Sequence, residues 1–124
     1  MNARARVAIV DDEEPVRTAL GRLLRLAHYD VTLFASGEEF LAALETEIPN
    51  CVVLDVSMPG ISGLDVQRRL RSVFIYIPAI CITASEDVAL LREALDAGAV
   101  DLLHKPISNA ALLQAIRVAL GTGH

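Results

Sequence analysis

Four short apolar runs, each followed by polar side chains, constrain the fold of this chain more than any other feature. Stretches with the helical spacing of apolar residues separate them, and this alternation predicts a parallel sheet covered by helices. Because the carboxyl ends of parallel strands share one edge, where such sheets bind ligands, the polar residues are expected to form one site. The runs and the residues that follow them are 7–10 before Asp11 and Asp12, 52–54 before Asp55, 79–82 before Thr83, and 100–103 before His104 and Lys105.

Capping signals indicate where the helices begin and end. Residues 36–39 have the form of a capping box that opens a helix ending near Glu45, and residues 62–65 have the form of the next one. We therefore interpret Asp65 as a capping carboxylate. The fourth helix is expected over residues 85–98, because Gly98 suits a helix end with positive φ. The remaining elements are a strand at 31–34, a first helix indicated by Val16, Leu20, Leu23, Leu24 and Ala27, and a last helix indicated by Leu112, Leu113, Ile116 and Leu120.

Composition predicts one domain over residues 1–124, with a core at about 6–120. The chain has 124 residues and 53% hydrophobic content, enough for an ordinary core. A net charge of -5 without a basic patch argues against direct nucleic-acid binding by this chain. No apolar run has the length of a membrane span or a signal peptide, so a cytoplasmic protein without membrane contact is expected. Cys51 and Cys81 lie in or beside strand runs, where buried, unpaired thiols are expected.

The adjacent carboxylates of Asp11 and Asp12 need a cationic partner. Two unit charges 4 Å apart repel by about 4 kcal/mol at an effective dielectric constant near 20. Mg²⁺ prefers one or two carboxylates together with waters and phosphate oxygens. The pair could instead cap the next helix, which carries Glu13 and Glu14 in its first turn. The presence of Asp55 favours the metal site.

Asp55 and Lys105 indicate phosphoryl chemistry. Asp55 ends a wholly apolar run and precedes a turn at residues 59–60, and a carboxylate can form an aspartyl phosphate. A metal beside it would neutralise the incoming phosphoryl oxygens. Lys105 is the only lysine beside ten arginines, and a compact ammonium suits a packed anionic site better than the rigid guanidinium fork. Thr83 adds a hydroxyl that could donate to a phosphoryl oxygen.

The polar residues and their neighbours occur along the chain in the order Asp11-Asp12, Asp55 with Met58-Pro59-Gly60, Thr83-Ala84 and Lys105-Pro106. This order resembles the receiver domains of two-component response regulators, over residues 6–120. The resemblance implies an α/β fold: a flavodoxin-like, doubly wound, five-stranded parallel sheet in the order 2-1-3-4-5 with five helices. The sequence of residues 54–60 is most similar to receivers attached to LuxR-type helix-turn-helix outputs.

The resemblance also implies a metal centre. Asp55 would be the phosphoacceptor and a Mg²⁺ ligand, Asp12 a direct ligand, and Asp11 a ligand acting largely through water. The backbone carbonyl of Ser57 would complete the protein ligands, and Mn²⁺ is expected to substitute for Mg²⁺.

A second group of positions would sense the phosphoryl group. Lys105 would pair with it, and Thr83 would move towards it as a switch hydroxyl. Leu102 stands where many receivers carry a tyrosine or phenylalanine, and Ile107 where a phenylalanine is common. We therefore expect the usual coupling between the threonine and an aromatic side chain to be altered.

The implied function is signalling. A sensor histidine kinase would phosphorylate Asp55, and the surface of the fourth helix, fifth strand and fifth helix would switch to control an output, with transcription expected. The chain would be no conventional enzyme, since it would catalyse only its own phosphorylation and dephosphorylation. Apolar residues on the two helices also predict a homodimer or partner surface there. A stand-alone single-domain regulator and a degenerate, phosphorylation-independent receiver stay open as alternatives.

Two other classes fit the sequence less well. A haloacid-dehalogenase-type phosphatase has a second aspartate two residues after its nucleophile, where this chain has Ser57. A flavodoxin-like electron carrier needs a phosphate-binding loop after the first strand, and the acidic residues 11–14 would repel a phosphate unless a metal were bound.

Overall fold

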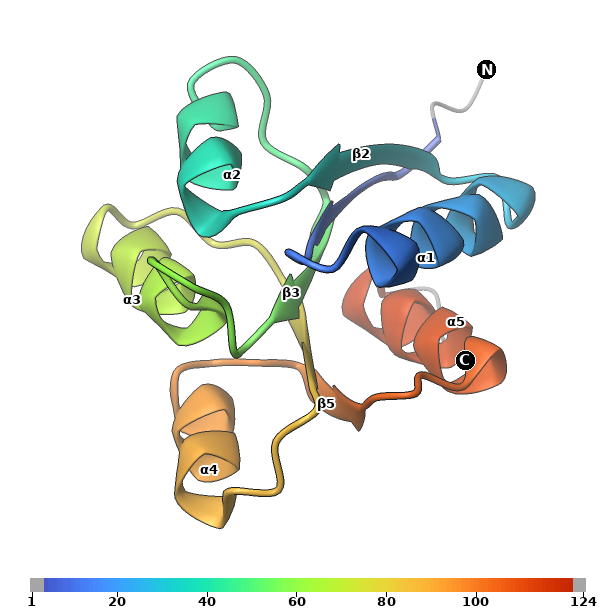
Figure 1. Cartoon of the computed structure of the whole chain (residues 1–124). Helices are drawn as coiled ribbons and strands as arrows, with labels where there is room; N and C mark the ends of the chain where they lie inside the picture. Colours follow the sequence, from blue (N-terminus) through green and yellow to red (C-terminus); the bar gives the residue numbers. More distant parts are fainter. Residues whose placement is uncertain (1–3, 122–124) are drawn as a thin grey trace.

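The computed structural model describes residues 4–121, in which a five-stranded parallel sheet lies between two layers of helices (Figure 1). The strand order is β2-β1-β3-β4-β5, which confirms the predicted topology. The strands are β1 (Arg6–Val10), β2 (Asp30–Phe34), β3 (Cys51–Asp55), β4 (Ala79–Thr83) and β5 (Asp101–His104). The helices are α1 (Glu14–Leu26), α2 (Gly37–Ala43), α3 (Gly63–Ser72), α4 (Val88–Asp96) and α5 (Asn109–Ala119).

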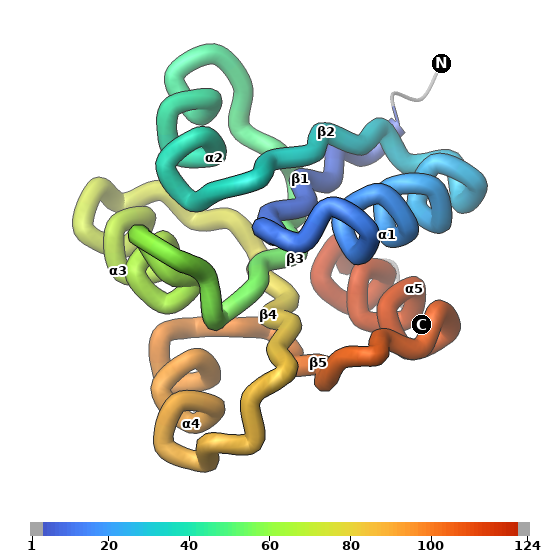
Figure 2. Tube along the Cα trace, viewed as in Figure 1, coloured from blue at the N-terminus to red at the C-terminus, as the bar shows by residue number. Residues whose placement is uncertain are grey.

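The alternation of side chains along the strands builds two cores, one on each face of the sheet. In β1, Val7 and Ile9 pack with α1 and α5, whereas Ala8 and Val10 pack with α2 and α3. Helix α4 covers the same face as α2 and α3, over a third cluster around Cys81 (Figures 1 and 2). The inner strands are therefore buried on both sides, as parallel strands usually are.

Side-chain caps fix the starts of α3 and α4. Ser62 and Asp65 form a complete capping box at the start of α3, which confirms the interpretation of Asp65. The prediction that the fourth helix begins at Ser85 was wrong, because α4 begins at Val88. The Asp87 carboxylate accepts hydrogen bonds from the amides of Ala89 and Leu90, and this cap fixes the later start.

The two cysteines are buried and unpaired, as predicted. Burial raises the pKa of the Cys51 thiol, and likewise that of Cys81, to about 12. No helix within residues 4–121 is long and apolar enough to cross a membrane.

Candidate phosphoacceptor and metal site

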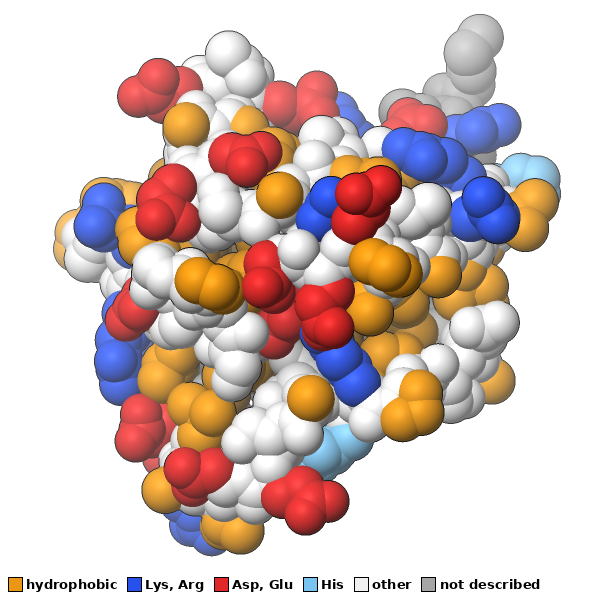
Figure 3. All heavy atoms as spheres, in the orientation of Figure 1, with side chains coloured by type: hydrophobic (Ala, Val, Ile, Leu, Met, Phe, Trp, Pro, Cys, Tyr) orange, Lys and Arg blue, Asp and Glu red, His pale blue; other side chains and the backbone are white. Residues whose placement is uncertain are grey.

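The topology brings three of the predicted carboxylates together at the carboxyl edge of the sheet. Asp11 follows β1 directly, Asp55 ends β3, and these two strands are neighbours. Carboxylate oxygens of Asp11, Asp12 and Asp55 all lie within 4.8 Å of one another. Asp11 and Asp55 are buried and Asp12 is exposed, so the cluster opens to solvent on one side. In the space-filling view, acidic side chains gather over this edge beside a basic one (Figure 3).

Lys105 lies among these carboxylates. Its Nζ atom is 3.0 Å from Asp55 Oδ2, 3.0 Å from Asp11 Oδ2 and 2.6 Å from Glu13 Oε1. The Lys105 amide donates to the Thr83 carbonyl at 2.8 Å, which ties the end of β5 to the end of β4. Glu13 is the site residue that sequence reasoning missed: its place in the acidic run 11–14 was the available signal, but it was assigned only to the helix dipole.

Backbone contacts hold Asp55 in place. Its Oδ1 atom accepts a hydrogen bond from the Ser57 amide at 2.9 Å. The loop then turns through Gly60, whose φ of +74° suits glycine. A Cβ on Gly63, the first residue of α3, would overlap the Asp55 carbonyl group. The end of β3 and the start of α3 are therefore packed so closely that position 63 has no space for a side chain.

Asp11 is held in a comparable way. Its Oδ1 atom accepts from the Glu13 amide at 2.8 Å, and Arg17 Nη1 donates to its carbonyl oxygen at 2.7 Å. Its Oδ2 atom is buried and 3.0 Å from Lys105 Nζ, but that contact lacks hydrogen-bond geometry. The atom is therefore a buried acceptor with unused capacity, facing the carboxylate cluster.

The charges of this site do not cancel. Burial raises the pKa of Asp55, although hydrogen bonds from Lys105 and the Ser57 amide oppose the shift. Burial alone would lower the pKa of Lys105, but its close contacts with the carboxylates of Glu13, Asp11 and Asp55 outweigh burial and raise that pKa. One ammonium thus serves several carboxylates. Clustered oxygens, an under-used buried acceptor and excess negative charge fit a hard divalent cation such as Mg²⁺.

Thr83 and Leu102 lie beside the cluster. Thr83 is buried, and its hydroxyl oxygen accepts from the Ser85 amide at 2.9 Å rather than contacting Asp55 or Lys105. Leu102, opposite Cys81 in the sheet, is half-buried and packs beneath α4. The switch role of Thr83, and the Ser57 carbonyl as a metal ligand, stay predictions.

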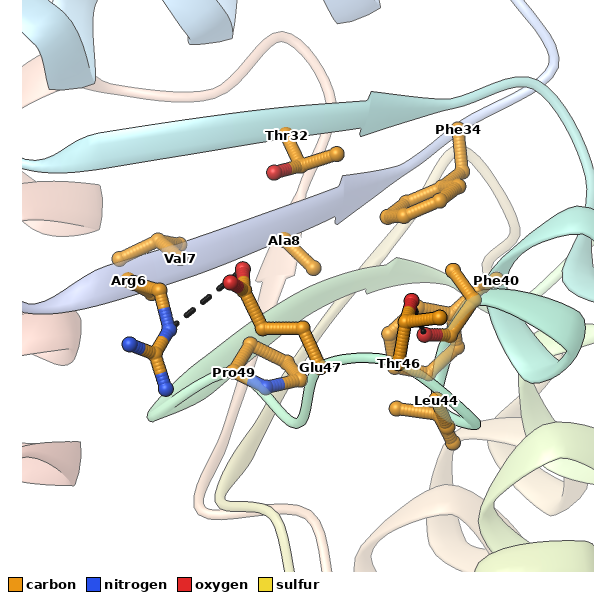
Figure 4. Close-up of a pocket in the computed structure, with 11 residues that line it drawn as sticks. Arg6, Val7, Ala8, Thr32, Phe34, Phe40, Leu44, Thr46, Glu47 and Pro49 are labelled. Carbon is orange, nitrogen blue, oxygen red and sulfur yellow. Dashed lines mark hydrogen bonds and ion pairs between the residues drawn. The ribbon is translucent and has the colours of Figure 1, made fainter.

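A separate cavity lies away from this chemistry. It measures about 260 Å³ and is lined by the edge-to-face pair Phe34 and Phe40, among others (Figure 4). The ion pair between Arg6 Nε and Glu47 Oε1, at 3.5 Å, lies at its wall. None of the predicted site residues lines it, so the open carboxylate edge is the candidate site.

Comparisons with known proteins identify the family of this chain. A family model described as response regulator receiver domain matches residues 7–117. The response regulator protein TodT of Pseudomonas putida is 42% identical over 121 residues, which are 97% of this chain and 53% of TodT. The transcriptional regulatory protein FixJ of Rhizobium meliloti is 41% identical over 113 residues, which are 91% of this chain and 55% of FixJ. A crystal structure of FixJ-N superposes with a TM-score of 0.88 at 39% identity, covering 98% of this chain and 96% of that one.

The fold and the acidic edge define a two-component signalling domain. The chain belongs to the family of response regulator receiver domains. It spans about half the length of the curated relatives that it matches.

Proposed function

We propose that Asp55 accepts a phosphoryl group from a sensor histidine kinase, with Mg²⁺ held by Asp11, Asp12, Asp55 and the Ser57 backbone carbonyl. The observation that carries this proposal is the clustering of three carboxylate oxygens within 4.8 Å, with Lys105 Nζ 3.0 Å from Asp55 Oδ2. Mn²⁺ has the same preference for oxygen ligands and should replace Mg²⁺.

The transfer is a nucleophilic displacement at phosphorus. A carboxylate oxygen of Asp55 forms the new P–O bond while the P–N bond to the kinase histidine breaks, and the leaving imidazole keeps that electron pair. Bound Mg²⁺ supplies the positive charge that lets a polyanion approach the carboxylates. Lys105 donates to Asp55 Oδ2 in the free domain, and we expect it to donate to a phosphoryl oxygen once the acyl phosphate forms. Within residues 4–121 the Thr83 hydroxyl only accepts a hydrogen bond, so its proton is available for the same purpose.

Acetyl phosphate tests this proposal without the kinase. With Mg²⁺ or Mn²⁺, the intact mass should rise by one phosphoryl group, and without a divalent cation it should not. Asp55→Asn should abolish labelling, whereas Asp65→Asn, at a capping carboxylate outside the cluster, should leave it in place. Full labelling of Asp55→Asn would refute Asp55 as the acceptor.

For the output, we propose that the surface of α4, β5 and α5 changes on phosphorylation and controls transcription through homodimerisation. Two observations support it: FixJ is named a transcriptional regulatory protein, and Val88, Leu95 and Val118 are exposed on α4 and α5. Ala94, Leu112 and Ile116 instead pack in the core, so the apolar surface is narrower than the sequence pattern suggested. A stand-alone regulator acting by protein contact is the alternative, and a monomer that still binds a partner through this surface would favour it.

A further inference from the structure

Shortly after α3, Phe74 adopts a backbone conformation that disfavours bulky side chains. Phe74 has φ of +59°, in the left-handed region where bulky side chains are rare. Its amide donates to the Arg71 carbonyl at 3.1 Å, and the Ile75 amide donates to the Leu70 carbonyl at 3.0 Å. This is the Schellman motif, whose left-handed position is usually glycine. Helix α4 ends in the same way with Gly98.

The Phe74 side chain contributes little stability to the isolated domain that could offset this backbone strain. It is 96% exposed, so it contributes almost no apolar burial. The neighbouring Tyr76 is 79% exposed, while the chain's other three aromatic residues, Tyr29, Phe34 and Phe40, are half-buried or buried. Only 4% of the residues in this chain are aromatic, yet two of them lie in solvent within a stretch of three residues. Folding does not explain this arrangement, whereas exposed aromatic side chains are typical anchors of interfaces.

An apolar groove lies beside these two side chains. It measures about 300 Å³ and is formed between the C-terminal ends of α3 and α4, with Leu70, Ile77 and Ala97 among its lining and Phe74 and Tyr76 at its exposed side. This volume is at the lower limit for small-molecule sites, so it suits one large side chain better than a whole ligand.

A basic side chain at the groove indicates the charge of its partner. Arg71 lines the groove, and within residues 4–121 neither Arg69 nor Arg71 pairs with a carboxylate. Arg68, one position earlier, does pair with Asp65 and Glu93. In the described part of the chain, Arg71 thus stands at an apolar groove without a carboxylate partner, and its guanidinium complements an acidic segment.

We propose that this groove is a docking site for an acidic segment of a partner protein. One large apolar side chain enters the groove against Phe74 and Tyr76, and flanking Asp or Glu residues pair with Arg71 and Arg69. In a parallel sheet the helices run back antiparallel to the strands, so the C-terminal ends of α3 and α4 lie at the amino edge, opposite Asp55 at the end of β3. Docking at the groove therefore leaves the phosphoacceptor edge free. The proposal does not depend on phosphorylation.

A randomised peptide library selected on the immobilised domain tests the proposal. Recovered peptides should carry Leu, Phe or Trp next to Asp or Glu, and the peptide recovered most often should shift the amide resonances of Leu70, Ile75 and Ala97. Phe74→Gly, Phe74→Ala and Arg71→Glu should each weaken its binding at least about tenfold. Replacing its acidic residues with Lys should restore binding to Arg71→Glu only.

His28 provides a matched control. It occupies the same motif position after α1, with φ of +72°, far from the groove. His28→Gly should leave peptide affinity unchanged, and thermal unfolding of each variant verifies that it folds. Recovery of no such peptides, or equal binding by the Phe74 and Arg71 variants, would overturn the proposal. So would Phe74-dependent binding to phosphatidylglycerol vesicles or Phe74-dependent self-association in place of peptide binding.

Discussion

Lys105 Nζ lies 2.6 Å from Glu13 Oε1 and 3.0 Å from Asp55 Oδ2, so the single ammonium of the site is shared between a helix start and the candidate phosphoacceptor. This sharing depends on the shape of the group. An ammonium on a flexible stem can contact carboxylates from several directions, whereas a guanidinium directs its donors within one plane.

Replacing Lys105 with arginine should therefore keep the charge and lose the geometry. We expect Lys105→Arg to fold and to bind Mg²⁺, yet to lose most of the resonance changes that beryllofluoride induces at Thr83 and in α4. Arg92 is exposed on α4, and Arg92→Lys is the control for a change between the two basic residues. A wild-type response from Lys105→Arg would mean that Lys105 is only a structural charge.

Phosphorylation should shift the association state only partly. Moving a population from 1:99 to 99:1 takes about 5.5 kcal/mol of differential binding. Leu102 fills the space beneath α4 with a side chain smaller than an aromatic ring and without a polar tip, so we expect a smaller bias. Sedimentation with and without beryllofluoride, at several protein concentrations, should show a monomer–dimer mixture that shifts towards dimer. Val88→Glu, at an exposed position, should suppress the dimer, and an unchanged monomer in both states would contradict homodimerisation.

Gly63→Ala should destabilise the domain by about 3 kcal/mol, the upper end of the range for overpacking, because the added Cβ meets backbone rather than a mobile side chain. Gly21→Ala is the matched control. Its Cβ would meet only the end of the Leu33 side chain, and alanine favours the helix interior, so the change should be close to neutral. Urea unfolding measures both variants, and equal stabilities would contradict the close packing of α3 on Asp55.

Phe74→Gly should stabilise the free domain by about 1 kcal/mol, since glycine relieves the left-handed conformation and little apolar area is lost. His28→Gly should stabilise it less, because histidine tolerates this conformation better than phenylalanine. Urea unfolding midpoints compare the two. A destabilised Phe74→Gly would show that the side chain supports the fold, contrary to its exposure.

The site residues at the carboxyl ends of the strands could be predicted from the sequence because the signals for them are local. Asp55 ends a continuous apolar run, and Lys105 stands out as the only lysine, so each could be recognised without its partners. The contact between Glu13 and Lys105 joins residues far apart in the chain and required the assembled sheet. The start of α4 was missed because Ser85 and Asp87 are both good caps.

The left-handed turn at Phe74 was beyond sequence reasoning for a related reason. Glycine is the usual signal for such a turn, and the chain has none there. The turn forms because the chain must leave α3 and enter β4, and the Ile75 amide satisfies a helix carbonyl in doing so. Tertiary connection therefore overrode local preference at that position.

The buried thiols should make the domain less stable at alkaline pH. An unfolded thiol ionises near pH 9, whereas burial holds the pKa of Cys51, and of Cys81, at about 12 in the folded state. Between these values the unfolded state loses protons that the folded state keeps, so stability falls as pH rises, by about 1.4 kcal/mol per pH unit for each thiol. Urea unfolding between pH 8 and about pH 10.5 should show this decline. Cys51→Ala should be less stable at neutral pH because of the lost packing. Its stability should fall less steeply with pH, by the slope that one thiol contributes. Tyrosines and the lysine are common to both proteins, so an identical slope would contradict the raised thiol pKa.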